Sequence, residues 1–237
     1  MQRHAFAWIR HLDVVLGDGR LPLTVDAYAF YGARWMRQLV VRNVPALTLR
    51  PRIFTNTESV DRVEISNTRL TAMDQFVFEG LKDVGRIVLD RVDVAGVHSY
   101  AFSGIHFRPD GPATSGTDTP DLPQVGSERR EERKMTRRRE RYARSGGLVN
   151  VTGCHVGVLS ADAFRDANLA QIVFSRTDVD RLDGHAFRGV TGLQSLRLVN
   201  CRVGPSLRAD MFAGLRGVRQ LHLEGLVGTR QVDGFVD

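Results

Sequence analysis

The chain has 237 residues, of which 42% are hydrophobic, 25% charged and 8% aromatic. This length holds one large domain or two small ones. The composition excludes a collagen, a wholly disordered chain and a disulfide-rich miniprotein. No stretch approaches the roughly 18 apolar residues that a membrane-spanning helix needs, so we expect no transmembrane segment in this chain.

The formal net charge of +6 comes from one short segment. Residues Arg129 to Arg144 contain nine basic and three acidic side chains, which leaves 24 basic and 24 acidic residues in the rest of the chain. The basicity is therefore local. It does not predict a basic surface over the whole fold.

Phenylalanines recur along the chain at nearly constant spacing. Successive members of this ladder are 24, 24, 24, 24, 62, 23 and 25 residues apart, and the long interval equals one repeat plus an insertion of 38 residues. The ladder contains eight of the twelve phenylalanines: Phe6, Phe30, Phe54, Phe78, Phe102, Phe164, Phe187 and Phe212. A fixed period of this length predicts a repeat architecture.

Within each unit the apolar residues occupy fixed offsets, as in Val60, Val63 and Ile65. The first unit follows the offsets more loosely, through Leu12 and Val15. The pattern L-x-x-L-x-L predicts a short strand with one buried face. Such strands must stack into a parallel sheet, because one unit alone cannot bury its apolar side. Helical repeats would need longer stripes of period 3.6, and Gly and Asp/Asn breaks every dozen residues argue against them.

The repeat resembles the leucine-rich repeat family, and the run Ala186 to Leu193 is similar to that of its extracellular 24-residue class. The resemblance covers roughly residues 4–105 and 148–227. It implies an α/β leucine-rich repeat solenoid of about eight units, a horseshoe with a parallel β-sheet on the concave side and turns or short helical segments on the convex side. The family's usual Asn or Cys after the strand is matched only by Cys154 and Cys201, since the equivalent residues elsewhere are Val44, Thr68, Val92, Thr177 and Leu226.

We expect one continuous solenoid made of residues 1–105 and 148–237, interrupted by a disordered basic insertion at 106–147. The first half of the insertion holds four prolines and many small polar residues, and the second half is dense in charge. Three interpretations stay open. The insertion is a tolerated loop, a contact for nucleic acid or another anionic surface, or a proteolytic or regulatory site within residues 137–141.

The two ends predict that the chain is a fragment of a longer protein. The first 15 residues contain no secretory signal. Phe6 already lies on the ladder, and Asp237 falls inside a new unit. Solenoids need terminal caps, and neither end shows one. We therefore expect the signal, the caps and any membrane anchor to lie outside this chain.

The candidate binding residues are the strand residues that flank each inward pair, because they form columns on the concave face. They carry both charge signs and no Phe, Trp or Tyr, which favours a protein partner and makes nucleic acid an unlikely ligand of this face. The set is Gln38, Val40, Arg42, Arg62, Glu64, Ser66, Arg86, Val88, Asp90, Asn150, Thr152, Gln171, Val173, Ser175, Ser195, Arg197, Val199, Gln220, His222 and Glu224. Asn150 also begins a glycosylation sequon, and a glycan there would obstruct the middle of this face.

We predict no catalytic residues, no metal site and no cofactor, because no known catalytic or phosphate-binding motif occurs. The neighbours Cys154 and His155 do not form a convincing pair, since the cysteine occupies an inward position. Cys154 and Cys201 are predicted to be buried free thiols.

The predicted function is non-catalytic recognition of another protein, as part of a secreted or membrane-anchored ectodomain. The extracellular location rests on the resemblance. The alternatives are an intracellular (cytoplasmic) scaffold of the same geometry, and binding of nucleic acid or an anionic surface through the arginine-rich insertion.

Overall fold

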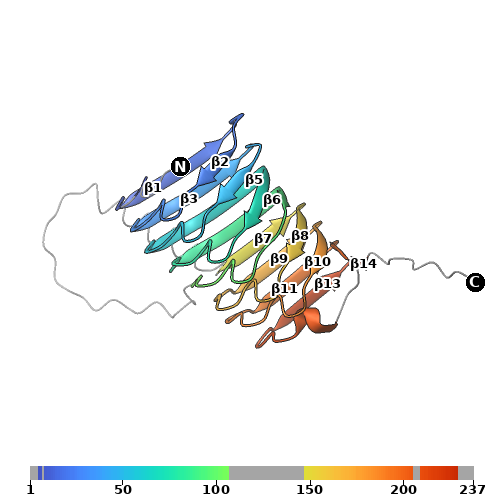
Figure 1. Ribbon diagram of the computed structural model, residues 1–237. Coiled ribbons are helices and arrows are strands. Elements are labelled where there is room, and N and C mark those ends of the chain that lie inside the picture. Colours follow the sequence, from blue (N-terminus) through green and yellow to red (C-terminus); the bar gives the residue numbers. More distant parts are fainter. Residues whose placement is uncertain (1–4, 7, 107–146, 205–208, 229–237) are drawn as a thin grey trace, which may run out of the picture.

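The computed structural model describes residues 5, 6, 8–106, 147–204 and 209–228. The chain forms a solenoid of parallel strands, stacked along one axis from the blue first turn to the red last turn (Figure 1). All the named strands belong to one 14-stranded sheet, and the eight ladder phenylalanines mark seven turns. The predicted repeat solenoid is confirmed.

Each turn contributes strands to two rows, which meet at a corner. β5 and β6 bend through the corner and belong to both rows. The first row also contains β1 (His11–Gly17), β3 (Trp35–Arg42), β7 (Leu148–Thr152), β9 (Gln171–Ser175), β11 (Ser195–Val199) and β13 (Gln220–Glu224), with β5 at Ser59–Met73 and β6 at Val84–Val94. The second row also contains β2 (Leu23–Val25), β4 (Leu47–Leu49), β8 (His155–Leu159), β10 (Asp178–Leu182), β12 (Arg202–Val203) and β14 (Val227–Gly228).

The second row differs from the expected α/β architecture. Where the resemblance implies turns or short helical segments, the chain is extended. Alternating β-branched residues such as Val92 and Val94 explain this, because they suit a strand with one buried face and both are buried. Among the described residues the only helical element is a short 3₁₀ turn, η1 (Ala209–Phe212).

The phenylalanine ladder forms the centre of the core. Neighbouring rings stack nearly parallel, with centroids 4.5–6.3 Å apart and interplanar angles of 9–20°. The rings between the two end members are at most 2% exposed. Burial of such rings contributes more than any other side chain to the hydrophobic stabilisation of each turn.

The repeat is continuous across the insertion. β6 pairs in parallel with β7, with Ile87 opposite Val149 and Leu89 opposite Val151. The rings of Phe102 and Phe164 stack at 4.5 Å, the shortest centroid distance in the ladder. Of the predicted insertion at 106–147, residues 107–146, which include its arginine-rich part, lie outside the described residues. His106 at its edge forms a parallel β-bridge with Asn168.

Removing residues 107–144 should leave the thermal midpoint unchanged or raise it. The strands on both sides already pair with each other, and a long loop costs only about 1–2 kcal/mol more than a short one. Differential scanning calorimetry of the full chain and the deletion variant measures the difference. A loss of more than about 4 °C, which corresponds to about 1–2 kcal/mol for a chain of this size, would show that the segment stabilises the solenoid.

The first turn corrects one expectation. Val15 was expected to point inward, but it is exposed and lies opposite Val40 in the outward column. The register shifts between Leu12 and Asp13, so that Val14 takes the buried position. The extra residue at this point is Arg37 of β3, and β1 has no counterpart to it, so the burial in β1 alternates regularly and Val14 takes the inward position instead of Val15.

The corner between the rows is held by small polar side chains. The Thr177 hydroxyl lies 3.0 Å from the Ser175 carbonyl oxygen and 3.3 Å from the Val151 carbonyl oxygen. The backbone N–H of Cys154 donates to the same hydroxyl at 3.5 Å. Both Thr177 and Cys154 are buried. These contacts satisfy backbone groups that the turn would otherwise bury without a partner.

The two cysteines are free and buried, as predicted. Cys154 and Cys201 lie two strand spacings apart, about 10 Å, which exceeds the reach of a disulfide. Burial raises the pKa of both thiols, and this lowers the reactive thiolate fraction. Titration with a thiol reagent should detect two thiols only after unfolding. Rapid reaction of either thiol in the native protein would contradict this arrangement.

Candidate functional site

The structure brings all twenty predicted binding residues together on the first row of strands. Cross-strand pairs such as Val40–Glu64, Glu64–Val88 and Asn150–Val173 align them in three outward columns. The columns run without interruption from β3 to β13. We call this surface the first-row face. That it binds a partner stays a prediction.

The first-row face has a centre on β7, β9 and β11 that contains a single charged side chain. Nine outward side chains lie there, and eight of them are amides, hydroxyls or aliphatic groups. Arg197 is the exception, and it is exposed. The nine are Leu148, Asn150, Thr152, Gln171, Val173, Ser175, Ser195, Arg197 and Val199. We call them the neutral patch.

Charged side chains lie on both sides of the neutral patch. On the N-terminal side Arg62 pairs with Glu64, and Asp90 pairs with Arg91 at 2.9 Å. On the C-terminal side the His222 ring lies 2.9 Å from the Glu224 carboxylate. Pairs that stay accessible to solvent, as these do, contribute little to stability, about 0–1 kcal/mol each. They do give the neutral patch a charged margin.

Two details of the first-row face were not anticipated. Leu148 completes the column between Arg86 and Gln171, and its half-buried side chain belongs to the neutral patch. Ser66 and Ser195 point outward but are only 8% exposed, because neighbouring side chains cover them. The period-2 alternation of a strand predicts to which side of the sheet a side chain points, but not how far its neighbours bury it.

Asn150, the sequon asparagine, lies in the neutral patch on β7. It is half-buried between Val88 and Val173 of the neighbouring strands. The Thr152 hydroxyl donates a hydrogen bond to the Asn150 side-chain oxygen at 3.2 Å. A glycan on Asn150 would therefore cover the neutral patch. Glycosylation stays a prediction.

The described residues contain no group of three His, Cys, Asp or Glu side chains that could hold a metal ion. The neighbours Cys154 and His155 point to opposite sides of the strand, one buried and the other exposed. They therefore do not form a joint site.

His155 instead joins three turns on the second-row surface, a contact that the sequence did not indicate. Its Nδ1 lies 3.1 Å from Asp93 and its Nε2 lies 3.1 Å from Asp180. Asp93 also accepts a hydrogen bond from Arg69 at 3.1 Å. Hydrogen bonds to Asp93 and then Asp180 raise the pKa of His155, and the bond to His155 is the largest cause of the lowered pKa of Asp93.

These shifts predict a pH-dependent stabilisation. A raised His155 pKa contributes stability that is complete below the unfolded value of about 6.5 and is lost as the pH rises through the folded pKa. The lowered Asp93 pKa contributes above its unfolded value of about 4 and is lost as the pH falls through its folded pKa. The contact therefore stabilises most between about pH 4 and 6.5, and its contribution declines as the pH rises from there through the folded pKa of His155. Because the side chains are half-exposed, we expect at most about 1 kcal/mol.

An NMR titration of the His155 ring should give a midpoint above 6.5. Asp93→Asn should lower that midpoint, since it removes the stronger acceptor. A wild-type midpoint at or below 6.5 would contradict the contact.

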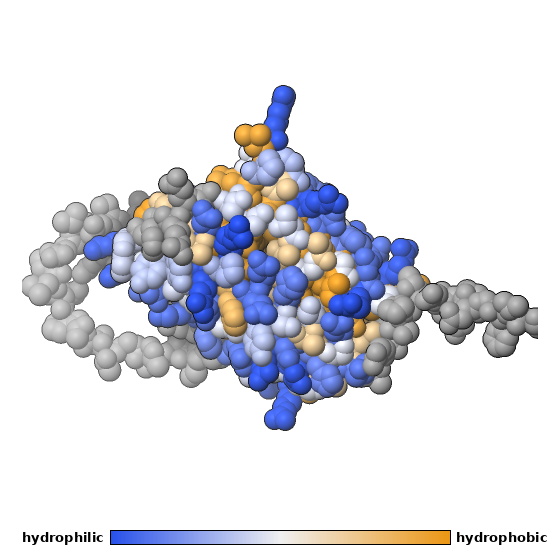
Figure 2. Space-filling view, viewed as in Figure 1, coloured by the Kyte–Doolittle hydropathy of each residue, from blue (hydrophilic) through white to orange (hydrophobic). Residues whose placement is uncertain are grey.

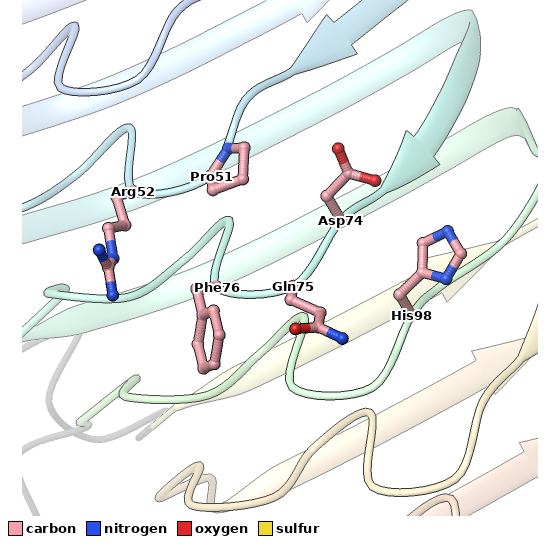
Figure 3. Close-up of a pocket in the computed structure, with 6 residues that line it drawn as sticks. All are labelled: Pro51, Arg52, Asp74, Gln75, Phe76 and His98. Carbon is pink, nitrogen blue, oxygen red and sulfur yellow. The ribbon is translucent and has the colours of Figure 1, made fainter.

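The loops opposite the strands form a hollowed region. Figure 3 shows a hollow lined by three successive turns, with Arg52 and Phe76 extending in the same direction and Asp74 and His98 beside them. The cavity volume is about 530 Å³, and it is open to solvent. Figure 2 shows that hydrophobic and hydrophilic side chains intermingle on the viewed face of the molecule.

The sequence matches no protein-family model and no curated protein. Within the described part of the chain, no helix has the length and apolar character to cross a membrane.

Proposed function

We propose that the protein is a non-catalytic recognition module that binds another protein through the first-row face. The observation that carries the proposal is the neutral patch with its charged margin. Protein interfaces have a core depleted of charged residues and a polar rim, and Arg is enriched among the residues that dominate binding energy. Arg197, exposed within the neutral patch, is the expected anchor.

The rigidity of the first-row face supports the same function. Each strand of the neutral patch is hydrogen-bonded on both sides, and the residues beneath it, such as Ile172 and Leu196, are completely buried. A surface held in this way loses little conformational entropy when it binds a partner.

We also propose that the repeat is of the leucine-rich type and that the protein acts at the cell surface or outside the cell. The repeat length, the offsets of the inward residues and the Ala186–Leu193 run support this. The sequon at Asn150 is compatible with export.

A site-specific photocrosslinker tests the function. Placed at Val173 in the neutral patch, it should capture a discrete protein partner from the protein's native environment. Placed at Arg69 on the second-row surface, it should not capture that partner. Arg197→Glu should abolish capture at Val173. Equal capture from both positions, or no effect of Arg197→Glu, would contradict the proposal.

A further inference from the structure

One position of the repeat, two residues before the ladder phenylalanine, has a left-handed backbone in six consecutive turns. The φ angles lie between 59° and 65°. Each backbone N–H at this position donates to the carbonyl of the same position one turn later, at 2.9–3.1 Å. The residues are Tyr28, Arg52, Phe76, Tyr100, Asp162 and His185. They form a third backbone ladder along the solenoid.

The first four members are unusual for this conformation. Asn, Asp and Gly adopt positive φ most easily, and a bulky side chain there carries strain. Yet four consecutive turns present Tyr, Arg, Phe and Tyr, while the next two present Asp and His. Strained backbone of this kind is concentrated at binding and active sites. We call Tyr28, Arg52, Phe76 and Tyr100 the outer ridge.

Side chains of the outer ridge stack along the surface and not in the core. The Arg52 guanidinium lies 5.9 Å from the centre of the Phe76 ring, and the Phe76 and Tyr100 ring centres are 5.7 Å apart. All three aromatic rings stay half-exposed. Tyr and Arg are enriched among the residues that dominate binding energy at interfaces.

Two open hollows lie along the outer ridge and meet at Pro51 and Arg52. The first, of about 490 Å³, is lined by Tyr28 and Asp26 among others. The second, of about 530 Å³, is lined by Phe76 and by residues on either side of it (Figure 3). The aromatic side chains of the two hollows belong to positions two turns apart, which is about 9.6 Å at the spacing of hydrogen-bonded strands.

We propose that these two hollows bind a Pro-x-x-Pro segment of a partner protein in the polyproline II conformation. That helix advances about 9.3 Å in three residues, so two prolines at positions i and i+3, with two residues between them, match the two hollows. Grooves lined by aromatic side chains are a known mode of binding for such segments. The site is separate from the first-row face.

The polar groups of the hollows fit this ligand. A polyproline II segment has no internal hydrogen bonds, so its carbonyl groups are free to accept bonds from exposed side chains such as Gln75 and His98. Charges of both signs line each hollow, Asp26 and Arg50 in the first and Asp74 and Arg52 in the second. This mixture favours an uncharged segment over an acidic peptide or a nucleic acid.

Fluorescence anisotropy with a labelled twelve-residue peptide that contains one Pro-x-x-Pro motif tests the proposal on the full chain. Saturable binding is expected, and a peptide with four residues between its prolines should bind at least about tenfold more weakly. Tyr28→Asn and Phe76→Asn should each weaken binding at least about tenfold, the loss typical of a hot-spot residue. Asparagine tolerates the left-handed backbone, so both variants should keep the fold.

The control is His185→Asn, which introduces asparagine at the same repeat position but in a turn far from the hollows. It should bind the peptide with wild-type affinity. Val173→Arg in the neutral patch should also leave peptide binding unchanged, so failure of this site is distinguishable from failure of the proposed function. No saturable binding, no preference for the proline spacing, or wild-type affinity of Tyr28→Asn would overturn the proposal. If Phe76→Asn does not fold, the affinity of Tyr28→Asn for the peptide decides whether the proposal holds.

Discussion

Replacing Phe102 with alanine should destabilise the protein by about 3–5 kcal/mol, the usual cost of removing a buried phenylalanine. The ring is 2% exposed and stacks between Phe78 and Phe164, at centroid distances of 5.2 and 4.5 Å. Removal of the Phe102 ring takes away core packing in the turns before and after the insertion at once. For a chain of this size the thermal midpoint should fall by on the order of 10 °C.

The matched control is Phe76→Ala, two residues before a ladder phenylalanine of the neighbouring turn. Phe76 is half-exposed, so its loss should cost only roughly 1 kcal/mol, the scale of one aromatic pair. Urea unfolding followed by circular dichroism compares the two variants. Equal destabilisation by both would contradict the assignment of the ladder as the core.

The second large effect is expected for Gly157→Ala, where β8 passes close to the preceding turn. A Cβ atom on Gly157 would lie 2.3 Å from the Ala95 carbonyl oxygen. This oxygen belongs to the backbone and cannot move aside as a flexible side chain can. Such overpacking typically costs about 1–3 kcal/mol, and a backbone clash belongs at the upper end.

Gly96→Ala is the control for this prediction. A Cβ atom there would lie 3.7 Å from the nearest atom, an ordinary van der Waals contact. We expect a change within about 0.5 kcal/mol. The same thermal and urea measurements apply to both variants. If Gly157→Ala were as stable as Gly96→Ala, the close approach of the two strands would not exist in solution.

Much of the fold was predictable because the repeat imposes the same local environment many times. The inward pair Val63 and Ile65, the stacked phenylalanines and the outward columns all follow from periodicity, and the structure shows them. Even the pairing of Ile87 with Val149 was readable, because the offsets resume after the insertion.

Features that depend on a single turn were not predictable. Val15 is outward because β1 lacks the extra residue that Arg37 adds to β3, and this exception occurs in the first turn alone among the described first-row strands. A feature shared by all the turns was also missed, the second row of strands, because its alternation, as in Val92 and Val94, is too short to distinguish from a turn.

The candidate sites also divide into those that periodicity predicts and those that it does not. The neutral patch could be listed from the sequence except for Leu148, since columns follow from register. The outer ridge could not be found, because its defining property is the backbone φ of Tyr28, Arg52 and Phe76. The His155 contact was also missed, since it joins three second-row strands, and their register had not been predicted.

The central claim is that one uninterrupted first-row face runs across the insertion, and a disulfide test addresses it most directly. Val88 lies opposite Asn150, about 4.8 Å away at the usual strand spacing and within the range of a disulfide. The double variant V88C/N150C should therefore oxidise to an intramolecular disulfide, detected by mass spectrometry after proteolysis. V88C/T152C, offset by two residues to about 7–8 Å, should not. Crosslinking of the offset pair alone would contradict the register and, with it, the continuous face.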